Sequence, residues 1–124
     1  MKQVFSVTVM VLGLALATGL GWADMGKGAA APLKTAPGSK AEMHNNEGIE
    51  HFTQGHWDVA KKHFMEAATT DPKSAEAHYN LALALDKAGD HKSATEHFKT
   101  AYELGKDNHD IQESGILKAH LKMK

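Results

Sequence analysis

The sequence predicts an all-α fold: two helix hairpins followed by a capping helix, arranged as a short α-solenoid. Two observations predict it. Residues 41–108 match themselves at a constant offset of 34 residues, which aligns Ala41 with Ala75 and Phe64 with Phe98 without a gap. Within each repeat, apolar residues recur every three or four positions, the spacing of one face of an α-helix. A repeat of this length with two helical stretches indicates one hairpin per unit.

The chain begins with a segment typical of a secretory signal. Lys2 supplies the charged start, residues 4–20 form an apolar run, and Gly21-Trp22-Ala23 places small residues where a signal peptidase cleaves. We therefore predict a signal peptide at residues 1–23 and a periplasmic or secreted protein. The alternative is an uncleaved inner-membrane anchor with the rest facing the periplasm, because the run approaches the roughly 17–25 residues that span a bilayer.

Residues 24–40 are rich in Gly, Ala and Pro and hold almost nothing large and apolar. Such a stretch buries too little surface to offset the entropy lost on ordering its backbone. We expect a flexible linker, disordered or extended.

The first hairpin is predicted at residues 41–74 and the second at residues 75–108. Gly55 and Gly89 interrupt the two periodic patterns and suit the left-handed residue that ends a helix. Asp90 suits the cap of the following helix, and Pro72 stands where the next helix can begin without losing a needed amide.

The last stretch, residues 109–124, predicts a C-terminal capping helix. Asp110 followed by Glu113 has the spacing of a capping box that opens such a helix.

Both units resemble the tetratricopeptide repeat in their small, glycine and aromatic positions. These positions are Gly48, Gly55, Ala60, Phe64, Ala67 and Pro72 in the first unit, and Ala82, Gly89, Ala94, Phe98 and Ala101 in the second. The resemblance implies a stack whose first helices line a concave face that binds a protein or peptide. Two units are fewer than the usual three, so we expect self-association, or a partner that covers the first hairpin.

The resemblance places partner binding on eight residues of the concave face: Asn45, Ile49, Phe52, Thr53, Tyr79, Leu83, Asp86 and Lys87. Four of them are apolar and recur at helical spacing, so we expect an open apolar patch for a helix or an extended peptide. The alternative is that they pack against the linker, the capping helix or a second copy of the chain.

Composition excludes several function classes. All 14 basic residues are Lys, and without Arg or a basic cluster specific nucleic-acid recognition is not expected. The absence of Cys excludes disulfides, thiolate metal sites and cysteine nucleophiles. The chain contains no Gly-rich phosphate loop and no His-Glu-x-x-His motif, so we expect neither catalysis nor a cofactor.

Histidine is unusually frequent, with nine residues in the chain. His44, Glu47 and His51 lie at three- and four-residue steps, on one face of a helix, and imidazole is a good ligand for copper, nickel or zinc. The sequence therefore favours a non-enzymatic adaptor that binds a protein of the cell envelope, with transition-metal binding or handling as the alternative function.

Overall fold

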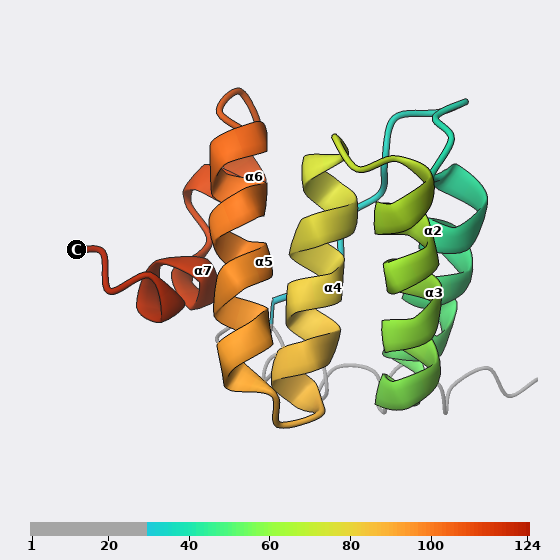
Figure 1. Ribbon diagram of the computed structural model, residues 1–124, viewed down its shortest axis with the longest axis horizontal. Helices are drawn as coiled ribbons and strands as arrows, with labels where there is room; N and C mark the ends of the chain where they lie inside the picture. The colour runs from blue at the N-terminus through green and yellow to red at the C-terminus, as the bar shows by residue number, and fades with distance from the viewer. Residues whose placement is uncertain (1–29) are drawn as a thin grey trace, which may run out of the picture. The chain divides into compact units, whose positions relative to one another are not determined.

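The computed structural model describes residues 30–124, and every regular element in this range is a helix (Figure 1). In chain order the helices are α2 (Glu42–Thr53), α3 (Trp57–Thr70), α4 (Ala75–Lys87), α5 (His91–Leu104), α6 (His109–Gln112) and α7 (Gly115–His120). The pairs α2–α3 and α4–α5 form two hairpins, and α4 packs against α3 of the first. The predicted all-α stack is confirmed. The predicted signal at residues 1–23, and residues 24–29, lie outside the described residues.

The turns of the two hairpins form as the sequence predicts. Gly55 and Gly89 adopt φ angles of +81° and +93°, in the left-handed region that favours glycine. Asp90 caps α5, because its Oδ1 accepts a hydrogen bond from the Ser93 amide at 3.1 Å.

The start of α4 differs from the prediction. Ser74, and not Pro72, stands at its beginning, since the Ser74 hydroxyl accepts a hydrogen bond from the Ala77 amide at 3.1 Å. Pro72 lies in the preceding turn, where its carbonyl oxygen is 2.9 Å from Nε2 of His78. The free amides at a helix start need an acceptor, and the serine side chain supplies one that proline lacks.

The core lies between the helices of each hairpin. Phe64 and Phe98 are completely buried, and alanines at equivalent positions on either side of them are buried as well. Gly48 lies against the ring of Phe64, where an added Cβ would stand only 2.5 Å from Cδ1. The close approach of α2 and α3 therefore requires glycine at this position.

The predicted capping region is divided into two short helices. Asn108 opens α6 by accepting a hydrogen bond from the Ile111 amide at 3.3 Å, so Asp110 is not the capping residue that we predicted. Ser114 opens α7 in the same way, and its buried hydroxyl also shares a hydrogen bond with Tyr79 of α4 at 2.8 Å. This bond attaches the junction between α6 and α7 to α4. Among residues 30–124, no helix combines the length and the apolar character needed to cross a bilayer.

Residues 31–40 do not form a helix, but they belong to the same compact unit as the hairpins. In Figure 1 this segment, drawn in cyan, passes behind α4 and reaches the start of α2. It is held there by the Leu33 amide, which donates a hydrogen bond to Asn80 of α4, and by the Leu33 carbonyl oxygen, which accepts one from Asn45 of α2. This part of the predicted linker is extended and attached to the repeats.

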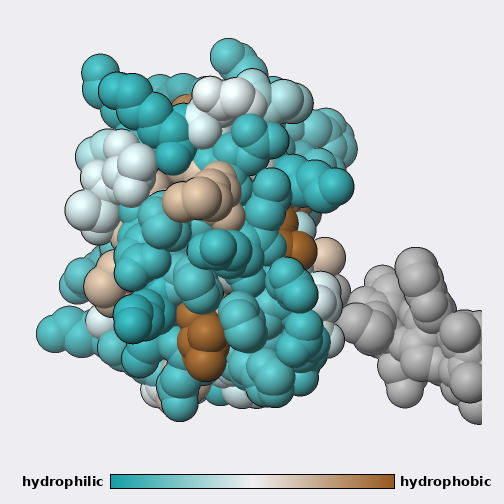
Figure 2. Space-filling view, turned by 90° about the vertical axis from the view of Figure 1, so that its right-hand side faces the viewer, coloured by the Kyte–Doolittle hydropathy of each residue, from teal (hydrophilic) through white to brown (hydrophobic). Residues whose placement is uncertain are grey.

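The outer face of the first hairpin is mainly hydrophilic. Figure 2 views the molecule from the side of α2 and α3, and hydrophobic residues appear there as small, separate spots. The exposed hydrophobic residues of these two helices are Met43, Val59 and Met65. The coverage of this hairpin by a partner or a second copy stays a prediction.

Candidate functional site

A pair of buried asparagines lies between the first helices of the two repeats. Asn45 of α2 and Asn80 of α4 both have no exposed surface. The Asn80 side-chain amide donates a hydrogen bond to Oδ1 of Asn45 at 2.7 Å, which joins the two helices. Their remaining hydrogen-bonding groups point to the extended segment that precedes α2.

The two asparagines bind both backbone groups of Leu33, its amide and its carbonyl oxygen. The Leu33 amide donates to Oδ1 of Asn80 at 2.7 Å. The Leu33 carbonyl oxygen accepts from Nδ2 of Asn80 at 2.7 Å and from Nδ2 of Asn45 at 2.9 Å. Only main-chain atoms of Leu33 take part, so these contacts recognise an extended backbone and carry little information about its sequence.

The segment around Leu33 is fixed at a second point. Thr35 is buried, and in an extended chain residues two positions apart face the same side. A turn follows, in which the Ser39 amide donates to the Ala36 carbonyl oxygen at 3.0 Å. The Gly38 amide then donates to Oε2 of Glu42, in the first turn of α2, at 2.7 Å. We call the surface of α2 and α4 around Asn45 and Asn80, which binds the backbone of Leu33, the asparagine groove.

The open apolar patch predicted on this face is wrong. Phe52, Tyr79 and Leu83 are only 7%, 3% and 2% exposed, and Ile49 is half-buried. Phe52 packs against Trp57 with ring centres 4.9 Å apart, and Tyr79 packs against Phe98 at 5.6 Å. Burial raises the pKa of Tyr79.

The position of α4 explains why these apolar residues are buried. It lies between α3 and α5, and its buried residues run without interruption from Tyr79 to Leu85. A helix buried nearly all round has no free apolar stripe to offer a partner.

The other predicted binding residues also have structural contacts. Thr53 is exposed, and its hydroxyl donates to the carbonyl oxygen of Glu50 at 2.8 Å. The Asp86 carboxylate accepts hydrogen bonds from His91 at 2.6 Å and from His120 of α7 at 2.9 Å. Lys87 places its ammonium group 5.4 Å from the centre of the Trp57 ring, which links the two repeats. Of the eight residues, Asn45 is the one that contacts the extended segment through a hydrogen bond.

Asn80, the hydrogen-bond partner of Asn45, was not among the predicted binding residues. The offset of 34 residues aligns Asn80 with Asn46, which is exposed, whereas the residue in contact is Asn45. Residues at equivalent positions of two repeats do not face each other, because neighbouring helices touch through different sides. The presence of asparagine at this point of both repeats was the sequence signal that could have indicated that the two residues act together.

Histidines form layers between the helices of each hairpin. Between α4 and α5 the rings of His78 and His97 stack with centres 5.3 Å apart, and their Nδ1 atoms are 3.1 Å apart. Burial lowers the pKa of His97, the neighbouring His78 lowers it further, and Glu96 acts in the opposite direction. The lowered pKa favours the neutral form of His97.

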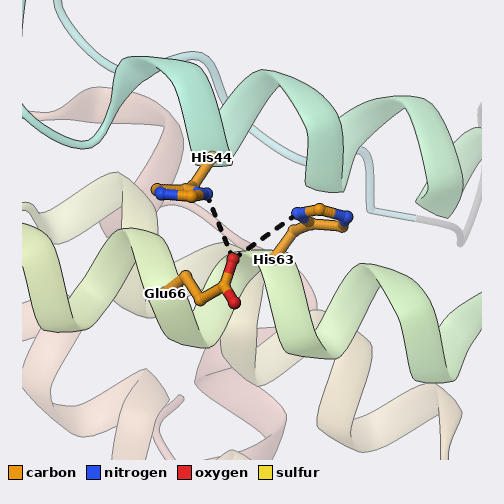
Figure 3. A group of neighbouring side chains, drawn as sticks. All are labelled: His44, His63 and Glu66. Atoms are coloured by element: carbon orange, nitrogen blue, oxygen red, sulfur yellow. Dashed lines mark ion pairs between the residues drawn. The ribbon is translucent and has the colours of Figure 1, made fainter.

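The layer between α2 and α3 brings together a different group from the predicted His44, Glu47 and His51. His44 lies 3.7 Å from Glu47, but the ring of His51 instead stacks on His63 at 5.4 Å. His63 and Glu66 of α3 point toward His44, as Figure 3 shows. His63 and Glu66 come from the facing helix α3, so the spacing of residues along α2 alone could not reveal them.

Comparison with known proteins agrees with the repeats seen in the structure. The family model of the tetratricopeptide repeat matches residues 45–109, which is just over half of the 124 residues. No curated protein matches the chain. The match runs from α2 to the start of α6 and includes both hairpins. With its repeat of 34 residues and its two packed helix hairpins, the chain belongs to the tetratricopeptide repeat family.

Proposed function

We propose that this protein is a non-enzymatic adaptor that holds an extended segment of a partner protein in the asparagine groove. Tetratricopeptide repeats generally mediate protein–protein interaction, which supports the adaptor class. One observation carries the choice of surface: Asn45 and Asn80 together bind both the amide and the carbonyl group of Leu33. An extended segment of a partner offers the same two groups.

The chemistry of the groove fits a backbone ligand. A carboxamide offers one acceptor and two donors, and the Asn80 side chain uses all of them, two on Leu33 and one on Asn45. Buried polar groups are costly without partners, so the protein is more stable when a segment occupies the groove. In the structure the chain itself supplies that segment, and a partner would have to replace it.

Replacement of the internal segment sets a threshold for binding. A tethered segment acts at an effective concentration in the millimolar range, so a partner must bind more tightly than the chain's own residues. The internal segment would thereby keep weak peptides out of the groove.

The setting that we propose is the periplasm, with a partner in the cell envelope. It rests on the charged start, the apolar run and the small residues before Asp24 in the sequence. Intact-mass measurement of the exported protein tests this part. A mass that begins at Asp24 supports it, and a mass that still includes residues 1–23 contradicts cleavage.

A peptide-binding experiment tests the groove. Leu33→Pro removes the amide that donates to Asn80, releases the internal segment and leaves the helices unchanged. A fluorescein-labelled peptide of residues 31–39 should bind this variant, measured by fluorescence anisotropy. The unaltered protein should bind it at least about tenfold more weakly, because its own segment competes. Lys34→Ala, which changes an exposed side chain of the same segment, is the matched control and should behave like the unaltered protein.

A second substitution links the result to the asparagines. Leu33→Pro combined with Asn80→Ala should lose the peptide, with helicity checked by circular dichroism. Affinity capture from the envelope fraction with the single and the double variant should then recover the partner with the single variant alone. Failure of Leu33→Pro to bind the peptide, or equal binding by both variants, would refute the groove.

A further inference from the structure

Two turns of facing helices bring four ligand-type side chains to one place. His44 and Glu47 lie three residues apart on α2, and His63 and Glu66 lie three residues apart on α3. This spacing puts both members of each pair on the same side of their helix. Figure 3 shows His44 pointing down from α2, toward His63 and Glu66 of α3. The four side chains are separate from the asparagine groove described above.

The distances between these side chains match those around a shared centre. His44 Nδ1 lies 3.1 Å from Oε2 of Glu66 and 3.7 Å from Oε2 of Glu47. His63 Nδ1 lies 3.1 Å from Oε2 of Glu47 and 3.8 Å from Oε2 of Glu66. Ligand atoms about 2.0–2.1 Å from a tetrahedral metal ion lie about 3.3 Å from one another. The ligand atoms of His44, His63 and Glu66 all lie within 4.8 Å of one another, and Glu47 is close to both histidines.

The two imidazole nitrogens lack the hydrogen bonds that an ordinary ion pair would give them. Nδ1 of His44 and Nδ1 of His63 are both buried, and neither has a hydrogen-bond partner of acceptable geometry. The carboxylate oxygens are close, but they are not in line with the rings. Buried polar atoms without partners are rare in folded proteins and call for an explanation such as an ion.

A second group of histidines shows the contrast. Asp86 accepts hydrogen bonds from His91 at 2.6 Å and from His120 at 2.9 Å, and the other ring nitrogen of His120 is hydrogen-bonded to Thr95 at 2.7 Å. Hydrogen bonds account for that group without an ion. The group between α2 and α3 is the one that they leave unexplained.

Charge and ring position favour a cation at the first group. A metal ion takes imidazole as a neutral ligand, so the two carboxylates would supply two negative charges that a divalent ion neutralises. His63 stacks on His51 with ring planes only 1° apart, which holds its ring in position. The side chains of His44 and His63 remain 27% and 23% exposed, so an ion can enter from solvent.

We propose that His44, His63 and Glu66, with Glu47 as a fourth ligand, bind one divalent transition-metal ion of the zinc, copper and nickel class. Imidazole and carboxylate donors suit these ions. The ion joins α2 to α3 and stabilises the first hairpin.

The test is titration of the protein with Zn²⁺ by calorimetry, with the protein purified without a polyhistidine tag. We expect one Zn²⁺ per chain, no binding of Mg²⁺, and a higher melting temperature with Zn²⁺ present. His63→Ala and the isosteric Glu66→Gln should each lower the affinity at least tenfold. Glu66→Gln keeps the shape of the side chain, so it remains informative if His63→Ala fails to fold. His91→Ala, at a histidine of the second group, is the matched control and should leave the affinity unchanged.

A spectroscopic measurement adds a direct readout. In NMR spectra, Zn²⁺ should shift the imidazole signals of His44 and His63 and leave those of His91 and His109 in place. The proposal is overturned by the absence of binding at millimolar Zn²⁺. It is equally overturned if Glu66→Gln binds as the unaltered protein does, or if His91→Ala is the variant that loses the ion.

Discussion

Asn80→Ala is the sharpest test of how the chain holds its own extended segment. The substitution removes three hydrogen bonds: one from the Leu33 amide, one to the Leu33 carbonyl oxygen and one to Oδ1 of Asn45. The Leu33 carbonyl oxygen keeps its bond from Asn45 Nδ2. Two groups therefore lose their only partner, the Leu33 amide and Oδ1 of Asn45.

The expected loss follows from those two groups. A buried polar group left without a partner costs about 1–3 kcal/mol, so the two together could cost about 2–6 kcal/mol. Residues 31–37 can detach and admit water, which lowers the cost toward the smaller value. We expect the free energy of unfolding to fall by about 2–4 kcal/mol, with the segment released before the helices unfold.

Urea unfolding followed by circular dichroism measures the loss, and hydrogen exchange at the Leu33 amide measures the release. Asn46→Ala is the matched control, because Asn46 is exposed and is the residue that the repeat aligns with Asn80. It should change the stability by no more than about 0.5 kcal/mol. If Asn80→Ala behaves like Asn46→Ala, or if the Leu33 amide stays protected, the account of the groove is refuted.

Two further predictions concern the core and the histidine layer. Gly48→Ala should destabilise the protein by about 1–3 kcal/mol despite the better helix propensity of alanine, because the new Cβ would stand 2.5 Å from Cδ1 of the buried Phe64 ring. Gly115→Ala, with nothing within 4 Å of the new Cβ, should not destabilise it, and equal urea midpoints for the two variants would contradict the packing argument. The lowered pKa of His97 means that the unfolded chain takes up a proton at a higher pH than the folded one. The stabilisation contributed by neutral His97 is complete above the pKa of this histidine in the unfolded chain, which is near 6.5. It is lost as the pH falls through the lower pKa of the folded protein. Thermal melts between about pH 5 and 7 should therefore show a smaller pH dependence in His97→Gln, and parallel curves for the two proteins would count against this.

Much of the fold followed from local signals. The repeat of 34 residues located both hairpins, and the glycines at 55 and 89 marked turns that do adopt left-handed angles. Phe64 and Phe98, which the repeat aligns with each other, are both completely buried. Local capping was harder to predict, since Pro72 and Asp110 are plausible helix starts in sequence. Ser74 and Asn108 are the residues whose side chains reach the free amides.

The candidate site was predicted less well, because it depends on which sides of two helices touch. Helical spacing placed Tyr79 and Leu83 on a common face, but it could not show that α3 and α5 cover α4 on both sides. The extended segment was expected as a linker because its residues bury little surface. Two buried carboxamides hold it through its backbone, and that interaction leaves no trace in side-chain composition.

The sequence by itself determined the repeat, the helical periods and the residues that pack inside each hairpin, because these depend on spacing along one or two neighbouring helices. Only the tertiary structure decided that Asn45 and Asn80 meet at Leu33, and that His44 and Glu47 face His63 and Glu66. Each of these groups is assembled from different elements of the chain. Their relative positions follow from how the helices pack, which no single stretch of residues specifies.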